Sequence, residues 1–227
     1  MATTTLSESF EEQLEKACQA LSLEPTKQQQ EKLLEYLGQL LKWNKTYNLT
    51  AIRAPDQALV QHIFDSLTII KPLISFFENR GQEARSILDV GSGAGLPGIV
   101  IATMIPDVAV TCVDTVEKKM TFVRQVSGVL ALTNLKAIHQ RVERMKDEKF
   151  NIVTSRAFAT LEDFATLAGE RVEKSGVLLA MKGKIPHDEI KILEEKTEWR
   201  VEKIELLEVP KLSAQRCLVW MNQKGTQ

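Results

Sequence analysis

The sequence has little of what marks a membrane, secreted or disulfide-stapled protein. No apolar run approaches the roughly 18 residues that a membrane-spanning helix needs. Residues 1–13 are polar and acidic, so we expect no signal peptide. There are three cysteines, too far apart and too few for a disulfide framework: Cys18, Cys112 and Cys217. We therefore expect a cytoplasmic protein that does not associate with membranes.

The net charge is close to zero, and histidine is rare. The formal net charge is −1, so the chain as a whole does not attract nucleic acid, and any such contact requires a local basic patch. The three histidines are not grouped with cysteines or carboxylates at metal-ligand spacing, so we expect no metal site. The 227 residues suffice for one sizeable α/β domain with a small appendage.

The most informative stretch is residues 86–98. An apolar, strand-like run is followed by Gly91, Gly93 and Gly95, and then by Pro97. Glycines allow the backbone to turn sharply and to approach a ligand closely. Pro97 suits the first turn of a helix, where its missing N–H has no cost. The pattern predicts a strand, a glycine loop and a helix N-terminus that together hold a nucleotide-like cofactor.

The chain begins with two predicted helices. Apolar residues over 10–21 recur at helical spacing, and Ser7 is a candidate N-cap. Pro25 ends this pattern, and a leucine stripe over 33–41 predicts the second helix. Together these helices predict a helical region at the start of the chain.

A mixed polar and aromatic segment follows. We expect residues 43–50 to form an ordered loop and a third helix to start after Pro55, ending near Pro72 or Phe77. The sequence thus predicts that residues 1–80 form a helical region packed on the rest of the chain.

From about residue 85, strand-like and helix-like segments alternate. Strands are predicted at 87–90, 108–113, 135–138, 150–155, 176–181, 201–207 and 217–221. Helical segments are predicted at 98–104, 118–130, 142–145, 161–170 and 187–196. The alternation predicts a doubly wound, mostly parallel α/β sheet over 81–227. Only residues 208–216 separate the last two strands, so we expect the last strand to be antiparallel. Seven strands in this arrangement are similar to the class I fold of methyltransferases that use S-adenosylmethionine (AdoMet).

The glycine loop departs from the nicotinamide-binding pattern. That pattern is G-x-G-x-x-G, whereas here Leu96 holds the last position and the third glycine is Gly95. Asp89, two residues before the first glycine, resembles the acidic first-strand residue of AdoMet-dependent methyltransferases. A carboxylate there can accept hydrogen bonds from loop amides or face the cationic end of AdoMet, which carries no diphosphate. The alternative is a glycine loop that only turns a corner.

Asp114 ends the second predicted strand, about 20 residues after the glycine loop. An acid at this place can bind both hydroxyls of a ribose. The alternative is that Asp114 or Thr115 caps the next helix. The spacing to the loop favours ribose binding, but this feature alone does not separate NAD from AdoMet.

Several cations follow later strands. Arg156 comes after the fourth strand and Lys182 after the fifth, so both are expected at the carboxyl edge of the sheet, where ligands bind. Lys184 and Arg216 are candidate neighbours in a basic rim for RNA phosphates. The alternatives are a surface salt bridge for Arg156 and solvated side chains for the lysines.

His62 and Asp65 share a face of the third predicted helix because they are spaced i, i+3. A helical histidine is commonly structural, and Asp65 could simply orient it. The alternative is that the pair closes the cofactor pocket or holds the substrate.

The assembled motifs resemble the RsmG (GidB) family of bacterial small-subunit ribosomal RNA methyltransferases, which modify N7 of guanine. They are NLTAIR at 48–53, HIFDS at 62–66, LDVGSGAGLPG at 88–98, SRAFA at 155–159 and KG at 182–183. The resemblance covers about 33–221, and it departs at Gln61, where the family usually has a basic residue.

The resemblance implies an enzyme that transfers a methyl group from AdoMet to guanine N7 in small-subunit (16S) ribosomal RNA. The residues expected to bind AdoMet are Asp89, Gly91, Gly93, Gly95, Leu96, Asp114, Val142, Glu143 and Arg156. Arg156 and Lys182 are expected to position the reacting groups, and the RNA is expected to contact His62, Asp65, Lys184 and Arg216.

The mechanism implied is a single in-line displacement. Guanine N7 already has a lone pair, so it needs alignment more than a general base. The expected partner is ribosomal RNA or the 30S particle, and we expect the enzyme to be a monomer. Two alternatives stay open: a nicotinamide-dependent oxidoreductase, and a non-catalytic ribosome-assembly factor that binds AdoMet.

Overall fold

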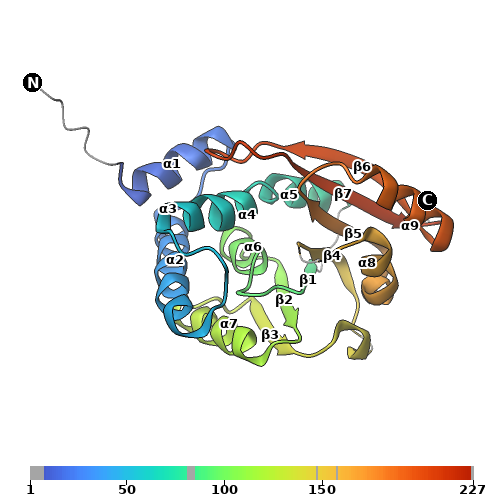
Figure 1. Cartoon of the computed structure of the whole chain (residues 1–227), viewed down its shortest axis with the longest axis horizontal. Helices are drawn as coiled ribbons and strands as arrows, with labels where there is room; N and C mark the ends of the chain where they lie inside the picture. The colour runs from blue at the N-terminus through green and yellow to red at the C-terminus, as the bar shows by residue number, and fades with distance from the viewer. Residues whose placement is uncertain (1–7, 81–84, 147, 157, 226–227) are drawn as a thin grey trace, which may run out of the picture.

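The computed structural model describes residues 8–80, 85–146, 148–156 and 158–225, which form a seven-stranded sheet with helices on both faces (Figure 1). The strands are β1 (Ser86–Val90), β2 (Ala109–Asp114), β3 (Leu135–His139), β4 (Phe150–Ser155), β5 (Val172–Lys182), β6 (Trp199–Leu207) and β7 (Arg216–Gln223). The N-terminal helices are α1 (Phe10–Ala20), α2 (Lys27–Tyr47), α3 (Pro55–Ala58), the π-helix η1 (Leu59–Phe64), α4 (Asp65–Leu67) and α5 (Ile70–Arg80). The later helices are α6 (Gly98–Met104), α7 (Glu117–Val129), η2 (Val142–Arg144), α8 (Leu161–Ala168), η3 (Gly169–Arg171) and α9 (His187–Lys196).

The strand order is β3-β2-β1-β4-β5-β7-β6. All neighbours from β3 to β5 are parallel, while β7 lies antiparallel between β5 and β6. The predicted antiparallel last strand is therefore confirmed. The strand order reverses between β1 and β4, and doubly wound sheets bind ligands at the carboxyl ends of the strands at such a point.

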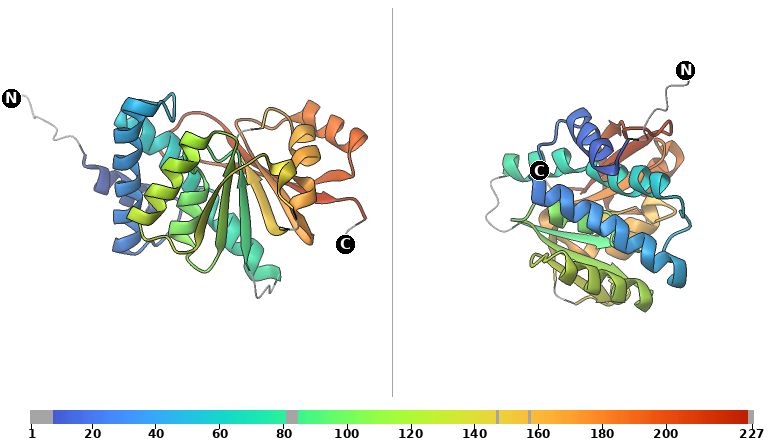
Figure 2. Two further views of the ribbon diagram at one scale, coloured as in Figure 1. Left: turned by 90° about the horizontal axis from the view of Figure 1, so that it is seen from below. Right: turned by 90° about the vertical axis from the view of Figure 1, so that its left-hand side faces the viewer.

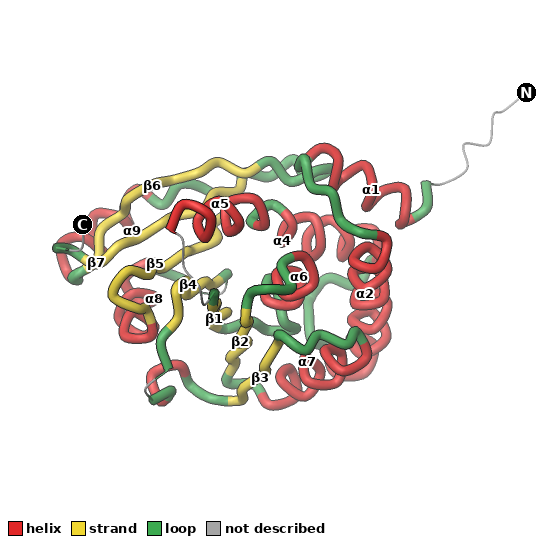
Figure 3. The backbone as a smooth tube through the Cα atoms, turned by 180° about the vertical axis from the view of Figure 1, so that it is seen from behind, coloured by secondary structure: helices red, strands yellow, loops and turns green. Residues whose placement is uncertain are grey.

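Side chains of the central strands alternate between two hydrophobic clusters, as the two-residue period of a strand requires. Ile87, Val110 and Ile152 face one cluster together with α6 and α7. Leu88 and Val153 face the other, with α8 and α9. Figure 2 and Figure 3 show these two helical layers on opposite sides of the sheet. Since both faces are covered, the central strands are apolar on both sides.

The N-terminal helices lie on one face only. Helix α5 packs on the sheet itself, where Phe76 stacks on Trp220 of β7 with ring centroids 5.6 Å apart, whereas α2 forms a second layer. Helix α2 packs against α6 and α7, and its leucine stripe belongs to the same buried cluster as Ile87. Tyr36 of α2 is fully buried and donates a hydrogen bond from its hydroxyl to the Ala94 carbonyl oxygen, at 2.9 Å. Helix α2 therefore contacts the glycine loop directly.

Gln29 joins the start of α2 to the end of α6. Its Oε1 accepts from the Thr26 N–H at 2.8 Å, as part of a capping box, and its Nε2 donates to the carbonyl oxygens of Thr103 and Met104 at 3.0 and 3.2 Å. We expect Gln29→Ala to lower the free energy of unfolding by about 1–2 kcal/mol, because one cap and the acceptors of α6 lose their partner. Denaturant unfolding measures this. Gln39→Ala, which removes only an exposed contact to Glu35, is the matched control and should change stability by less than about 0.5 kcal/mol.

The expected loop at 43–50 is wrong in its first half, because α2 continues through Tyr47. The rings of Trp43 and Tyr47 pack at 4.9 Å, and Trp43 lies 5.4 Å from the ring of Phe122 in α7. The buried Asn44 donates to the Ile52 carbonyl oxygen and accepts from the Thr50 N–H. Its side chain thus organises the loop that does follow, which is why a polar residue lies inside the helix.

Other boundaries also differ. Ser7 lies outside the described residues, and α1 is capped by Ser9 through a capping box with Glu12. The third helix is not uniform, since the π-helix η1 interrupts it. Strand β5 begins at Val172 rather than 176, because Val172 pairs with Phe150 before a shift in register. The predicted helix at 161–170 ends as α-helix at Ala168.

Candidate active site

The glycine loop follows β1 at the reversal of strand order. Gly91, Gly93 and Gly95 have φ of 67°, 60° and 89°, which is the region that favours glycine. The N–H of Gly91 donates to the Val113 carbonyl oxygen at 2.8 Å, which fixes the loop to the end of β2. Pro97 is the residue that precedes α6 rather than part of its first turn, so this detail of the sequence prediction is wrong.

Asp89 lies behind the loop and is completely buried. Its Oδ2 accepts the Gly98 N–H at 2.8 Å, and among the described residues its buried Oδ1 has no hydrogen-bond partner. Burial raises the pKa of Asp89 to about 7, although the Gly98 N–H and Arg156 act in the opposite direction. The amide that Asp89 binds is therefore the first N–H of α6, directly after the glycine loop.

Asp114 ends β2 beside the loop. Its Oδ2 accepts the Gly93 N–H and its Oδ1 accepts the Val116 N–H, both at 2.9 Å. The carboxylate thus supports both the loop and the approach to α7, whose N-cap position is occupied by Val116. Each carboxylate oxygen has further acceptor capacity. Asp114 therefore combines a structural role with a place on the cavity described next.

Three cavities lie along this edge of the sheet. We call the first, of about 300 Å³, the loop cavity; its lining includes Gly91, Asp114, Gln140, Val142, Glu143 and Phe158. The histidine cavity, of about 150 Å³, is lined by residues that include Thr50, His62, Gly91, Gly93, Leu96 and Arg156. The arginine cavity, of about 370 Å³, is lined by residues that include Gln61, His62, Asp65, Arg156, Lys182 and Arg216. Neighbouring cavities share lining residues, so they adjoin one another, and we refer to the three together as the cleft.

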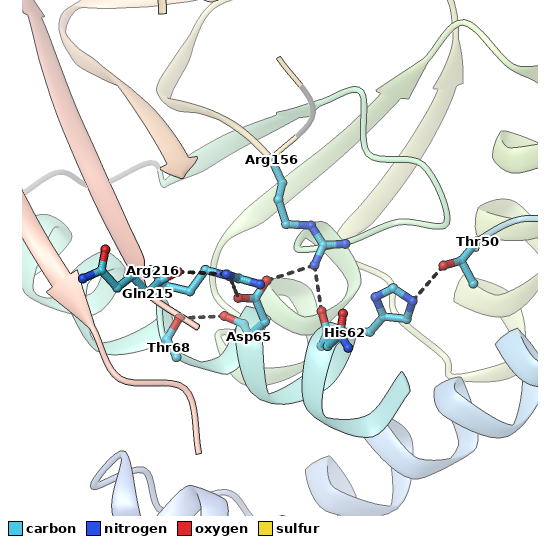
Figure 4. A network of polar contacts seen from close by, with 8 residues as sticks. Thr50, His62, Asp65, Thr68, Arg156, Gln215 and Arg216 are labelled. Carbon is cyan, nitrogen blue, oxygen red and sulfur yellow. Dashed lines mark hydrogen bonds and ion pairs between the residues drawn. The ribbon is translucent and has the colours of Figure 1, made fainter. Parts of the chain in front are cut away.

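His62 projects from the π-helix into the cleft. Its Nε2 lies 3.0 Å from Thr50 Oγ1 (Figure 4), and Thr50 Oγ1 accepts the Ile52 N–H. Burial, together with the charge of Arg156, lowers the pKa of His62 to about 4. The imidazole is therefore neutral at neutral pH. Thr50 was not singled out from the sequence as a site residue, although it lies within the 48–53 motif.

Asp65 binds two arginines from different strands (Figure 4). Its Oδ2 lies 3.1 Å from Nη1 of Arg156, which follows β4, and its Oδ1 lies 2.8 Å from Nε of Arg216, the first residue of β7. Arg156 Nη1 also donates to the Gln61 carbonyl oxygen at 3.3 Å. The structure thus joins Asp65, which was expected to pair with His62, to two cations of the predicted basic rim.

The two candidate lysines have different surroundings. Lys182 lines the arginine cavity, but its ammonium donates to the carbonyl oxygens of Phe158 and Ala159 and to Glu189, at 3.3, 3.0 and 2.8 Å. These three acceptors match the three N–H donors of an ammonium. Lys184 is exposed and does not line the three cavities. Lys182 therefore holds the segment after β4, and a positioning role for it in catalysis stays a prediction.

In residues 8–80, 85–146, 148–156 and 158–225, no three His, Cys, Asp or Glu side chains gather in a way that could hold a metal ion. Within the same residues, no helix has the length and apolar character to cross a membrane.

The sheet order, the glycine loop after β1 and the acid at the end of β2 define a class I AdoMet-dependent methyltransferase fold. Solved structures with this fold include a ribosomal protein L11 methylase from Lactobacillus delbrueckii subsp. bulgaricus, at a TM-score of 0.51 and 13% identity over 68% of this chain and 78% of that one. TrmN from Thermus thermophilus also has a TM-score of 0.51, at 11% identity over 73% of this chain and 53% of that one. These two likenesses concern the fold alone.

Comparison of the sequence with known proteins shows the family of this chain. The chain belongs to the rRNA small subunit methyltransferase G (GidB) family, whose model matches residues 29–219. Proteins named ribosomal RNA small subunit methyltransferase G are 54% identical in Bordetella petrii, over 94% of this chain and 83% of that one, and 49% identical in Methylibium petroleiphilum, over 93% and 94%. The family resemblance noted from the motifs is confirmed. Neither an oxidoreductase nor a non-catalytic assembly factor is favoured by these matches.

Proposed function

We propose that this protein transfers a methyl group from AdoMet to N7 of a guanine in small-subunit ribosomal RNA. Membership of the family supports the RNA substrate, and the motif resemblance supports guanine N7. The observation that carries the proposal is that the three cavities adjoin one another. The loop cavity shares Gly91 with the histidine cavity, which in turn shares His62 and Arg156 with the arginine cavity. A cofactor and an RNA nucleotide can therefore lie in adjoining parts of one site.

The residues of the cleft fit AdoMet. The loop cavity, at about 300 Å³, has the size of a small-molecule site, and the positive-φ Gly91 brings bare main chain to its wall. In this proposal Asp114 binds the ribose, Val142 and Glu143 border the adenine, and Gly91, Gly93, Leu96 and Arg156 surround the amino-acid portion. Gly95 does not line these cavities and shapes the loop from the side of α6, since a Cβ there would lie 2.6 Å from Ile99 Cδ1. Asp89 acts through the Gly98 N–H that it holds. When bound, AdoMet supplies an electrophilic methyl group.

The protein's part in the reaction is to align the guanine with the methyl group of AdoMet and to exclude water from the site. Guanine N7 has a lone pair and no proton to lose, so no general base is needed. His62, neutral because of its lowered pKa, can border the target base without repelling Arg156. Arg156 and Arg216 would contact the RNA, with Lys184 as an outer cation. We further propose that the protein is a monomer, and that it acts in the cytoplasm because its proposed substrate is ribosomal.

The proposal is tested by incubating the purified protein with labelled AdoMet and small-subunit RNA or particles that lack the modification. We expect label in one nucleotide of that RNA, carried as 7-methylguanine after digestion. Thermal unfolding with AdoMet or NAD should show a higher Tm with AdoMet only, because a ligand that binds the folded state stabilises it. Label at another atom, or only in large-subunit RNA or tRNA, contradicts the proposal. AdoMet binding without any transfer to RNA or particles would identify a non-catalytic factor.

A further inference from the structure

The carboxylate of Asp65 is buried between two guanidinium groups. The side chain of Asp65 is 4% exposed, whereas those of Arg156 and Arg216 are 27% and 24% exposed. The Thr68 hydroxyl donates to the main-chain carbonyl oxygen of Asp65 at 2.6 Å, so the backbone that carries this side chain is also anchored. Burying a charged carboxylate is unfavourable, and the two arginine partners offset that cost. This arrangement fixes both arginines to one rigid point in the N-terminal helices.

Asp65 itself cannot serve as an RNA contact of the usual kind. It is almost wholly buried, and a carboxylate offers acceptors only, which a phosphate would repel. The sequence suggested that Asp65 contacts the RNA directly. Its burial indicates instead that it acts on the RNA through the two arginines. What the RNA can reach is the outer edge of each arginine.

Both arginines keep N–H donors that have no acceptor among the described residues. Among the described residues, Arg156 donates only from Nη1, and Arg216 donates from Nε to Asp65 and from Nη1 to the Gln215 carbonyl oxygen. The remaining N–H groups belong to partly exposed side chains that line the arginine cavity. Guanidinium groups bind phosphate through pairs of parallel hydrogen bonds when their planes are fixed. Lys182, with its three donors occupied, does not compete for this role.

We propose that Asp65 is a positioning residue that orients Arg156 and Arg216 so that their free N–H groups bind a backbone phosphate of the RNA in the arginine cavity. The inference rests on the proposed function for the identity of the RNA. It goes further by assigning the arginine cavity to a phosphate of the RNA and by giving Asp65 the role of orienting the arginines that bind it. The carboxylate lowers the net positive charge of the cavity by one, but it fixes the geometry of two guanidinium groups.

Asp65→Asn separates geometry from charge. The variant raises the net charge by one, so electrostatics alone predicts tighter RNA binding with a steeper dependence on salt. Positioning predicts the opposite, because an asparagine places N–H donors against one of the arginines and releases it. We expect the Kd for small-subunit ribosomal RNA, measured with S-adenosylhomocysteine so that no turnover occurs, to rise about tenfold. The slope of log K against log salt should become shallower by about one.

Asp107→Asn is the matched control. It removes the same charge from an exposed pair with Arg85, 2.7 Å apart, at the opposite end of the strands, so RNA binding should stay within twofold of the unchanged protein. Binding by Asp65→Asn that is as tight as or tighter than that of the unchanged protein overturns the proposal. If the variant does not fold, Arg216→Lys replaces it: the charge is kept but the fork is lost, so weaker binding supports the proposal and unchanged binding overturns it.

The readouts distinguish this inference from the proposed function. Binding with S-adenosylhomocysteine does not depend on methyl transfer, so a protein that binds the RNA without methylating it contradicts the proposed function while the Asp65 comparison still stands. If methylation by Asp65→Asn falls only through a lower Tm, with KM for RNA and the salt slope unchanged, Asp65 is merely structural and the inference is wrong.

Discussion

Replacing Gly98 with alanine is expected to lower the free energy of unfolding by about 3 kcal/mol. A Cβ at this position would lie 2.4 Å from Cys112 Sγ and 3.0 Å from Asp89 Oδ2, inside a core that cannot yield on that side. Overpacking of this kind costs about 1–3 kcal/mol, and displacement of Asp89 from the Gly98 N–H adds about 1 kcal/mol. Denaturant unfolding measures the loss. The rise in Tm on adding AdoMet should shrink too, because Asp89 supports the glycine loop.

Two other helical glycines provide controls. Gly38 in α2 and Gly128 in α7 have no atom within 4 Å of an added Cβ, so alanine at either should stabilise the protein by about 0.5–1 kcal/mol. In the Gly98→Ala background, Cys112→Ala removes the colliding sulfur and should recover part of the stability, which gives a non-additive double-mutant cycle. If Gly98→Ala behaves like Gly128→Ala, or if Cys112→Ala gives no recovery, the steric account is wrong.

The sheet could be predicted closely from sequence because its signals are local. Apolar runs bounded by glycine and polar residues identified each strand, and the short link before β7 indicated its direction. The prediction failed where a distant contact decides the structure. Helix α2 continues through Tyr47 because Trp43 packs on Phe122, and no pattern within residues 43–50 reveals that partner.

The candidate site shows the same division. The glycine loop and Asp114 are linked by a local spacing, and the structure joins them through the Gly93 N–H. The pairing of Asp65 with Arg216 spans 151 positions of the chain, so only the folded sheet brings them together. Tyr36 was hidden in an apolar helical stripe, since its hydrogen bond to the Ala94 carbonyl oxygen leaves no mark in the sequence. The motifs therefore indicated which residues belong to the site, while the structure shows which of them contact one another.

Asp89 should make the protein without AdoMet less stable as pH rises from 4 to 7. Burial raises its pKa from 3.8 to about 7, so over this range the folded state keeps a proton that the unfolded state has lost. The contribution is fully present below pH 3.8 and is lost as pH rises through 7, at about 1.4 kcal/mol per pH unit. In Asp89→Asn this loss is absent. The stability of Asp89→Asn relative to the unchanged protein should therefore rise by about 3 kcal/mol between pH 4 and 6.5.

His62 acts in the opposite direction over the same range. Its pKa falls from 6.5 to about 4 on folding, so below pH 6.5 the unfolded state binds a proton that the folded state refuses. That contribution is present above pH 6.5 and is lost as pH falls through 4, so it offsets the contribution of Asp89 in the unchanged protein. The stability of His62→Gln relative to the unchanged protein should fall by about 3 kcal/mol from pH 4 to 6.5, the mirror image of Asp89→Asn. Urea unfolding across this range measures both differences, and Asp107→Asn, at an exposed ion pair, should give a nearly flat one. Parallel stability curves for all the variants would mean that neither buried group titrates as its surroundings require.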